Sequence, residues 1–179
     1  MMKKSRLLKT TLSAMFFALG YVLPFFTGQI QEIGSMLCPL HIPVLLCGFI
    51  CGSPWGLAVG ITLPLFRSLT LSMPPLFPKA ICMALELATY GAVAGLMHRI
   101  LPKKKIFVYL SLLTAMLGGR LVWGLAMFII MGVGGGTFTL SAFMASTVFE
   151  AVPGIILQII LIPLLVILLD NPKIIDLKN

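Results

Sequence analysis

The stretch IILQIILIPLLVILL (residues 155–169) contains one glutamine and no charged residue. A strand of a membrane barrel would alternate apolar and polar residues, and this stretch does not alternate. An open sheet would leave backbone groups unpaired in lipid. The stretch therefore predicts an apolar helix, and it indicates an all-α fold for the chain that contains it.

The composition of the whole chain places this helix in a membrane. Of the 179 residues, 59% are hydrophobic and 10% are charged, and the mean hydropathy is +1.09. A water-soluble domain needs a more polar surface than this composition supplies. Since a helical crossing takes about 20 residues, the chain has room for about six crossings and no soluble domain. We expect a single domain over residues 1–179, an integral membrane bundle of six helices.

Apolar runs, separated by glycine, proline and charged residues, give the expected helices. They lie near residues 10–26, 37–51, 54–70, 78–100, 106–131 and 141–170. A cleavable signal peptide is the alternative for the first run. No small-residue cleavage pattern follows it, and Tyr21-Val-Leu-Pro-Phe-Phe26 favours a retained helix.

Basic residues cluster at the ends of these helices. They are Lys3, Lys4, Arg6, Lys9, Arg99, Lys103, Lys104, Lys105, Lys173 and Lys178. An even number of crossings puts all of them on one side, which the positive-inside rule makes the cytoplasm. We therefore expect a multi-pass protein of the cell membrane with both termini in the cytoplasm. The net charge of +8 then reports topology, and no nucleic-acid partner is expected, because no soluble face could carry a binding groove.

Ionisable residues inside the expected helices are few, and charge within a bilayer is costly unless it faces a cavity or a partner. They are His41, Arg67, Glu86, Arg120 and Glu150. Each comes from a different helix, and all fall in the outer half of the membrane. Helical spacing places Lys79 and Tyr90 on the face of Glu86, and Trp123 on the face of Arg120. The eight residues together predict a pocket, open to the outside, for a small organic ligand with one ionised end.

A purely structural interpretation of the same residues stays open. Arg67 and Arg120 could form two buried ion pairs with Glu86 and Glu150 that only hold the bundle together. His41 alone would more often be a hydrogen-bonded residue at a helix end, and Trp123 alone would more often be packing.

Small residues at four-residue spacing predict close helix packing. The pair Ala14 and Ala18 marks one face of the first helix. Two glycine series, Gly48, Gly52, Gly56 and Gly60, and Gly91 and Gly95, are expected to permit tight contacts within the bundle.

Catalytic and metal-binding patterns are missing from the sequence. It contains no nucleophile elbow, zinc-protease motif, P-loop or Cys-x-x-Cys, so we expect no enzyme activity and no cofactor. Cys38 with His41, or Cys47 with Cys51, could in principle bind a metal. Apolar filling is the preferred interpretation of these cysteines.

Several motifs resemble one family of membrane proteins. They are Ala14-x-x-x-Ala18, the stretch from Cys38-Pro-Leu-His41 to Gly52, Leu63-Pro-Leu-Phe-Arg67, Met73-Pro-Pro-Leu-Phe-Pro78 and Met83-Ala-Leu-Glu-Leu-Ala-Thr-Tyr-Gly91. With the six-helix plan, they resemble a substrate-binding S component of an energy-coupling-factor (ECF) transporter.

The resemblance implies a vitamin-class substrate, taken up into the cell. It also implies two kinds of partner, a transmembrane coupling subunit that docks on the Ala14 and Ala18 face and two cytosolic ATPases. No histidine follows Met1, so the metal-transporting branch is not supported.

The local pattern is most similar to pantothenate-type S components, in which Arg120 or Arg67 would pair with the ligand carboxylate. The acidic residues leave room for a basic or base-like ligand instead, such as a deazapurine (a queuosine precursor), pyridoxine or thiamine. A facilitator that works alone and a structural membrane protein that binds no ligand are the other two function classes.

Overall fold

The computed structural model describes residues 2–27, 38–102, 104–133 and 152–169, and this part of the chain is helical without a strand. Its α-helices are α1 (Met2–Val22), α3 (His41–Cys51), α4 (Ser53–Leu71), α5 (Ile81–Ile100), α6 (Lys105–Val133) and α8 (Val152–Leu169). Two short turns precede or follow them, the 3-10 turn η1 (Leu23–Thr27) and the π-type turn η2 (Leu76–Ala80). The expected all-helical fold is confirmed, and the described part of the chain contains six α-helices.

The expected boundaries differ most at the first two helices. α1 begins at Met2 rather than at residue 10, since the basic segment taken as a flank is itself helical. α3 begins at His41 rather than at residue 37, because residues 38–40 form a turn before it. Cys38 in that turn has a positive φ of 47°, a conformation that cannot continue a right-handed helix.

The other boundaries lie close to those expected. α5 begins at Ile81 instead of residue 78, because residues 78–80 belong to the π-type turn η2. α4 and α6 match their expected ranges to within two residues at each end. The start of the last expected helix, residues 141–151, lies outside the described residues.

Four segments of the described chain are long and apolar enough to cross a membrane. They are Arg6–Phe26, Leu76–Ile100, Lys105–Gly132 and Val152–Leu169. α3 has 11 residues, which rise about 16 Å, roughly half of a hydrocarbon core. Of its residues only Ile50 is not fully buried, so this short helix lies inside the bundle.

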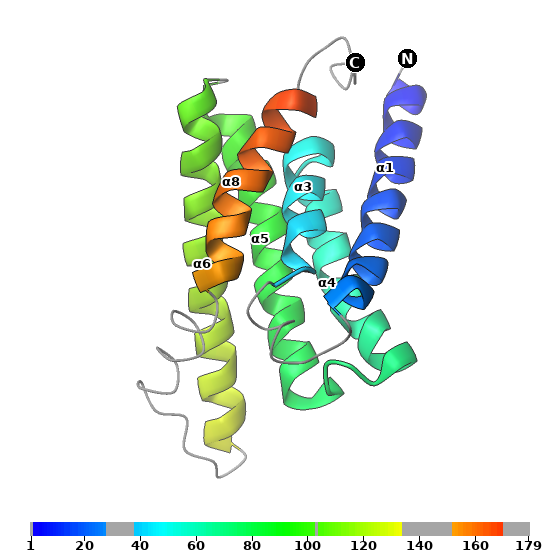
Figure 1. Cartoon of the computed structure of the whole chain (residues 1–179), viewed down its shortest axis with the longest axis vertical. Helices are drawn as coiled ribbons and strands as arrows, with labels where there is room; N and C mark the ends of the chain where they lie inside the picture. Colours follow the sequence, from blue (N-terminus) through cyan, green and yellow to red (C-terminus); the bar gives the residue numbers. More distant parts are fainter. Residues whose placement is uncertain (1, 28–37, 103, 134–151, 170–179) are drawn as a thin grey trace.

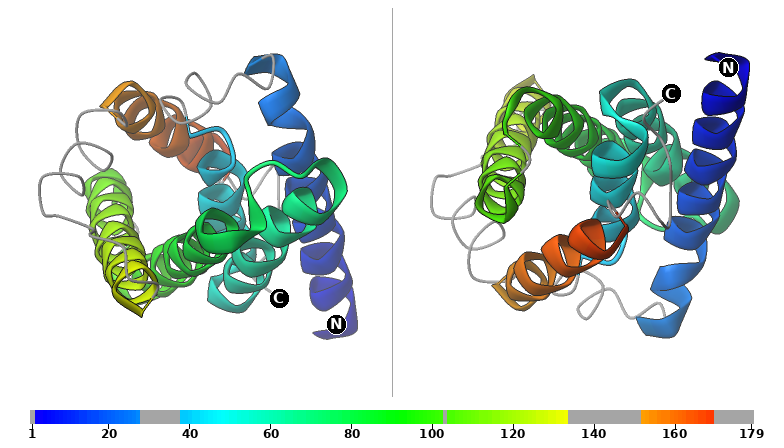
Figure 2. Two further views of the ribbon diagram at one scale, coloured as in Figure 1. Left: turned by 90° about the horizontal axis from the view of Figure 1, so that it is seen from below. Right: turned by 90° about the horizontal axis from the view of Figure 1, so that it is seen from above.

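α3 lies in the middle of the bundle, and the other helices are arranged around it (Figures 1 and 2). α5 packs against α3, α4 and α6, whereas α1 packs against α3 and α4 on one side of the molecule. α8 packs against α3 and α6 on the other side. α3, α5, α6 and α8 therefore enclose a common interior, to which the buried faces of four different helices contribute.

Glycines let the backbones of α3, α4 and α5 meet directly. A Cβ atom at Gly48 would lie 2.5 Å from the carbonyl oxygen of Gly91, and one at Gly56 would lie 2.6 Å from the same oxygen. A Cβ at Gly60 would overlap the backbone of Leu87, and one at Gly95 would overlap Ser53. The predicted role of both glycine series in close packing is confirmed at these positions.

Gly52 of the first series has a different role. Its φ of +99° lies in a region that L-residues rarely adopt, and it forms the turn between α3 and α4. This turn reverses the chain over a single residue, so α3 and α4 begin their contact at once.

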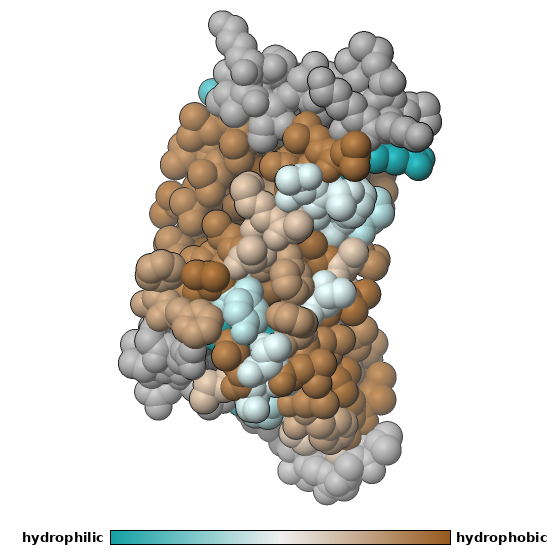
Figure 3. Space-filling model, turned by 90° about the vertical axis from the view of Figure 1, so that its right-hand side faces the viewer, coloured by the Kyte–Doolittle hydropathy of each residue, from teal (hydrophilic) through white to brown (hydrophobic). Residues whose placement is uncertain are grey.

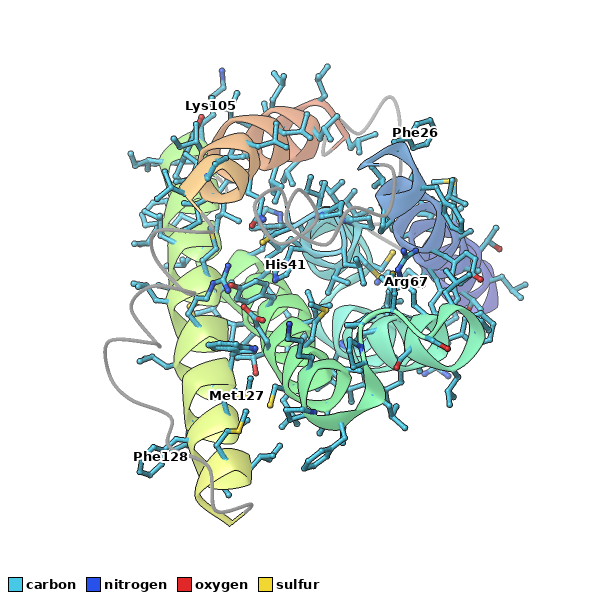
Figure 4. The ribbon with its side chains drawn as sticks, turned by 60° about the horizontal axis from the view of Figure 1, so that its bottom comes forward. Phe26, His41, Arg67, Lys105, Met127 and Phe128 are labelled. Carbon is cyan, nitrogen blue, oxygen red and sulfur yellow. The ribbon has the colours of Figure 1, made fainter. Side chains whose placement is uncertain are left out.

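The outer faces of the helices carry exposed apolar side chains. On α6 these include Leu117, Leu121 and Leu125, which are four residues apart and more than 60% exposed. Figure 4 shows Phe128 pointing away from the bundle while its neighbour Met127 turns toward it. One whole face of the molecule is apolar over most of its height, with a pale, weakly polar stripe (Figure 3). These surfaces are suited to lipid.

The basic segments share one end of the bundle. The N-terminal end of α1, the turn between α5 and α6, and the C-terminal end of α8 lie together (Figure 1). Lys104 in this turn is exposed. The basic residues of the described chain are thus grouped as expected, whereas Lys103, Lys173 and Lys178 lie outside the described residues.

Candidate functional site

Glu86 of α5 is the centre of a buried polar cluster and is 2% exposed. Its side chain lies one and a half turns into α5, about 8 Å from the start of that helix. Three groups approach the same carboxylate oxygen, Oε1. Since no water reaches this oxygen, these contacts must compensate its negative charge.

Arg120 of α6 supplies the opposite charge. Its Nη1 lies 3.2 Å from Oε1 of Glu86, and its Nη2 donates a long hydrogen bond of 3.8 Å to the sulfur of Cys38. The side chain of Arg120 is 17% exposed. The ion pair joins the middle of α6 to α5, and the cysteine links both to the turn before α3.

His41 and Tyr90 complete the cluster. The Tyr90 hydroxyl donates to Oε1 of Glu86 at 3.1 Å, and Nε2 of His41 lies 3.5 Å from the same oxygen. The two rings lie 5.1 Å apart. Tyr90 follows Glu86 by one turn of α5, and Gly119 of α6 provides the space that its ring fills, because a Cβ at Gly119 would overlap it.

Some polar atoms of the cluster have no hydrogen-bond partner within the described part of the chain. They are Nε of Arg120 and both ring nitrogens of His41, all of them buried. An unpaired buried polar atom costs about 1–3 kcal/mol. Nε of Arg120 and Nδ1 of His41 are two such atoms, whereas Nε2 of His41 keeps its 3.5 Å contact with Glu86. A bound ligand could satisfy them.

Gln158 of α8 is a residue that the sequence analysis missed. It is 1% exposed, and its Oε1 has no partner among the described residues. It belongs to the buried stripe of α8, the helix that packs against α3 and α6. Gln158 is the one polar residue in the apolar stretch 155–169, and this isolated position could have identified it as a candidate site residue.

Arg67 lies apart from the cluster. It is 4% exposed, its Nη1 donates to the carbonyl oxygen of Tyr21 at 2.8 Å, and its guanidinium lies over the ring of Phe25 at 5.4 Å. Figure 4 shows Arg67 between α4 and α1, away from His41. Its hydrogen bond satisfies one of the last carbonyls of α1, which lack partners within the helix. The structure thus does not bring Arg67 together with Glu86.

The structure brings none of the three remaining predicted residues, Lys79, Trp123 and Glu150, into the contacts around Glu86 described above. Lys79 is exposed in η2, and Trp123 is half-buried on α6, one turn from Arg120. Glu150 lies outside the described residues. The cluster therefore consists of His41, Glu86, Tyr90 and Arg120.

The structural alternative expected two buried ion pairs, and the described chain contains one of them, between Arg120 and Glu86. Within the described chain Arg67 has no carboxylate partner, and Glu86 is the sole acidic residue. No group of three histidine, cysteine or acidic residues suited to a metal is found there either. The sulfur of Cys47 donates to Ser13 of α1 at 3.6 Å, and all four cysteines are buried.

Ala14 and Ala18 are both exposed on α1. The helix turns Ser13, Phe16 and Gly20 toward the bundle instead. The alanine face is therefore not used for packing within the described chain.

Comparison with known proteins gives one match. A model of the protein family described as "ECF transporter, substrate-specific component" matches residues 8–166. No curated protein and no solved structure gives a significant match.

Proposed function

The chain belongs to the substrate-specific components of ECF transporters, and we propose that it captures a vitamin-class micronutrient from the extracellular side for ATP-driven import. The family consists of integral membrane subunits of transporters and not of enzymes. The observation that carries the proposal is the cluster around Glu86. Burying polar atoms without hydrogen-bond partners in an apolar bundle costs free energy, and a bound ligand that supplies the partners would remove this cost.

The position of the cluster supports extracellular capture. His41 and Glu86 lie near those ends of α3 and α5 that are remote from the basic end of the bundle. If the basic end is cytoplasmic, a ligand from outside reaches the cluster through less than half of the membrane. Pantothenate and base-like vitamins remain the two substrate classes that the sequence favours.

The partners we propose are a transmembrane coupling subunit and two cytosolic ATPases. The exposed face of Ala14 and Ala18 supports docking of the coupling subunit there, because small side chains let a second helix approach closely in lipid. A facilitator that works alone would need no such face.

Ligand binding and transport should separate when this face is filled. We expect a member of a vitamin panel to raise the melting temperature of the purified protein in detergent. The variant Ala14→Leu/Ala18→Leu should keep that stabilisation, but uptake of the same vitamin into cells with the coupling subunits should fall at least about tenfold, since bulky side chains hold the partner helix away.

Ala58→Leu is the matched control, because Ala58 is an exposed alanine on α4. It should leave both binding and uptake unchanged. Equal loss of binding and uptake in the double variant would assign Ala14 and Ala18 to internal packing. Full uptake in cells without coupling subunits would favour the facilitator, and no stabilisation by any panel member would favour a structural protein.

Orientation can be measured with a single introduced thiol. All four native cysteines are buried, so Lys104→Cys should react alone with a membrane-impermeant maleimide. We expect labelling only after the cells are opened, whereas Ser72→Cys, exposed at the other end of α4, should be labelled in intact cells. Labelling of Lys104→Cys in intact cells would reverse the topology and the proposed direction of capture.

A further inference from the structure

The charges of the cluster compensate each other before any ligand is present. Glu86 contributes one negative charge and Arg120 one positive charge, 3.2 Å apart. These two charges cancel each other, and the described chain has no other acidic residue to change this balance. An ionised ligand group would therefore add an unbalanced charge to a buried position, at a high desolvation cost.

The buried atoms without partners indicate which hydrogen-bonding groups a ligand must supply. Nε of Arg120 is a donor, and Oε1 of Gln158 is an acceptor. Nδ1 of His41 is a further buried atom without a partner among the described residues, whereas Nε2 of His41 faces Glu86 at 3.5 Å. The open positions thus include both kinds of hydrogen-bonding group and no free charge.

Gln158 can belong to the same interior as the cluster. It lies about 17 Å from the C-terminal end of α8, and His41 lies about 15 Å from the corresponding end of α3. Both ends lie toward the basic end of the bundle, and α8 packs against α3 (Figures 1 and 2). The two residues therefore lie on adjacent helices, each in the half of its helix that is remote from the basic end.

We infer that the substrate meets His41, Arg120 and Gln158 as an uncharged group that both donates and accepts hydrogen bonds, such as an amide, a lactam or a pyrimidinone. The inference rests on the proposed function and narrows its substrate class. It favours a base-like heterocycle over a carboxylate that would pair with Arg120, as a pantothenate-type ligand would.

Matched pairs of probes test the inference. Nicotinamide with nicotinate, and panthenol with pantothenate, differ in the charge of one group, and cytosine adds an uncharged pyrimidinone. Binding is measured by thermal shift and calorimetry on the full-length protein in detergent. We expect cytosine, or the uncharged member of a pair, to bind at least about tenfold more tightly than the anionic members.

The variant Glu86→Gln is designed to switch this preference. It keeps the shape of the side chain but leaves Arg120 with an uncompensated charge, so nicotinate or pantothenate should now bind more tightly than its uncharged partner. In the double variant Glu86→Gln/Arg120→Gln, the preference for the uncharged probe should return. Gln158→Met should weaken binding of the uncharged probe at least about fivefold without lowering the melting temperature of the free protein.

The possible failures are distinguishable. Tighter binding of an anionic probe by the native protein would overturn the inference while supporting the proposed function. Binding of no probe by the native, folded protein would count against both. If Glu86→Gln does not fold, the preference of the native protein and of the double variant for uncharged or anionic probes still tests the inference.

Discussion

Replacing Arg120 with glutamine is expected to destabilise the protein by about 3–5 kcal/mol, the usual cost of leaving one member of a buried ion pair without its partner. Glu86 is 2% exposed, so water cannot take the place of the lost guanidinium. The Tyr90 hydroxyl and the His41 ring would remain near its carboxylate, but neither supplies the permanent positive charge of a guanidinium. Melting temperature in detergent and unfolding by denaturant measure the loss.

The double variant Glu86→Gln/Arg120→Gln is the control for this effect. Because it removes both charges, it should recover most of the stability that Arg120→Gln loses. A double variant as unstable as the single one would show that hydrogen bonding to Cys38 or packing, and not charge balance, makes Arg120 necessary. Arg67→Gln is a useful comparison, since Arg67 contacts a carbonyl and two aromatic rings and should lose stability that no change at Glu86 restores.

Replacing Gly91 with alanine is expected to lower the free energy of unfolding by about 1–3 kcal/mol, although alanine is the better helix former. The added methyl group would overlap the backbone of Gly56. Backbone atoms of a packed helix cannot move aside as a flexible side chain can, so α4 and α5 would have to separate. Thermal unfolding of the purified variant measures the cost.

Gly118→Ala provides the matched comparison on α6. The nearest atom to its added methyl group would be Cγ2 of Thr89 at 3.7 Å, an ordinary contact. This variant should be as stable as the native protein or slightly more stable, since it gains helix propensity. Equal stability of Gly91→Ala and Gly118→Ala would contradict the close contact of α4 with α5.

Hydropathy was sufficient to predict the helical fold, because each apolar run must satisfy its backbone internally in lipid. It did not predict that α3 is only 11 residues long. Residues 38–40 are as apolar as the helix they precede, and hydropathy does not distinguish a buried turn from a helical one. The glycine series was informative since only close backbone contact uses several glycines at four-residue spacing.

The site was predicted in part for a similar reason. Helical spacing put Tyr90 beside Glu86, and depth along the helices matched Glu86 with Arg120, as the structure has them. Depth alone does not say which neighbour a helix face meets, so Arg67 was grouped with residues that it does not contact. Spacing also gave no weight to Gln158, because an uncharged polar residue is far less costly in a membrane than a charge.

The shortness of α3 has a consequence for how the chain enters the membrane during synthesis. An inserting segment is recognised by its apolar length, and 11 residues fall well below the roughly 17 that a spanning helix needs. α4 follows after a single glycine, and its backbone contacts the same glycine of α5 that α3 contacts. We therefore expect α3 to enter the bilayer together with α4 as a helical hairpin, and its packing against Gly91 requires α5 to be in place.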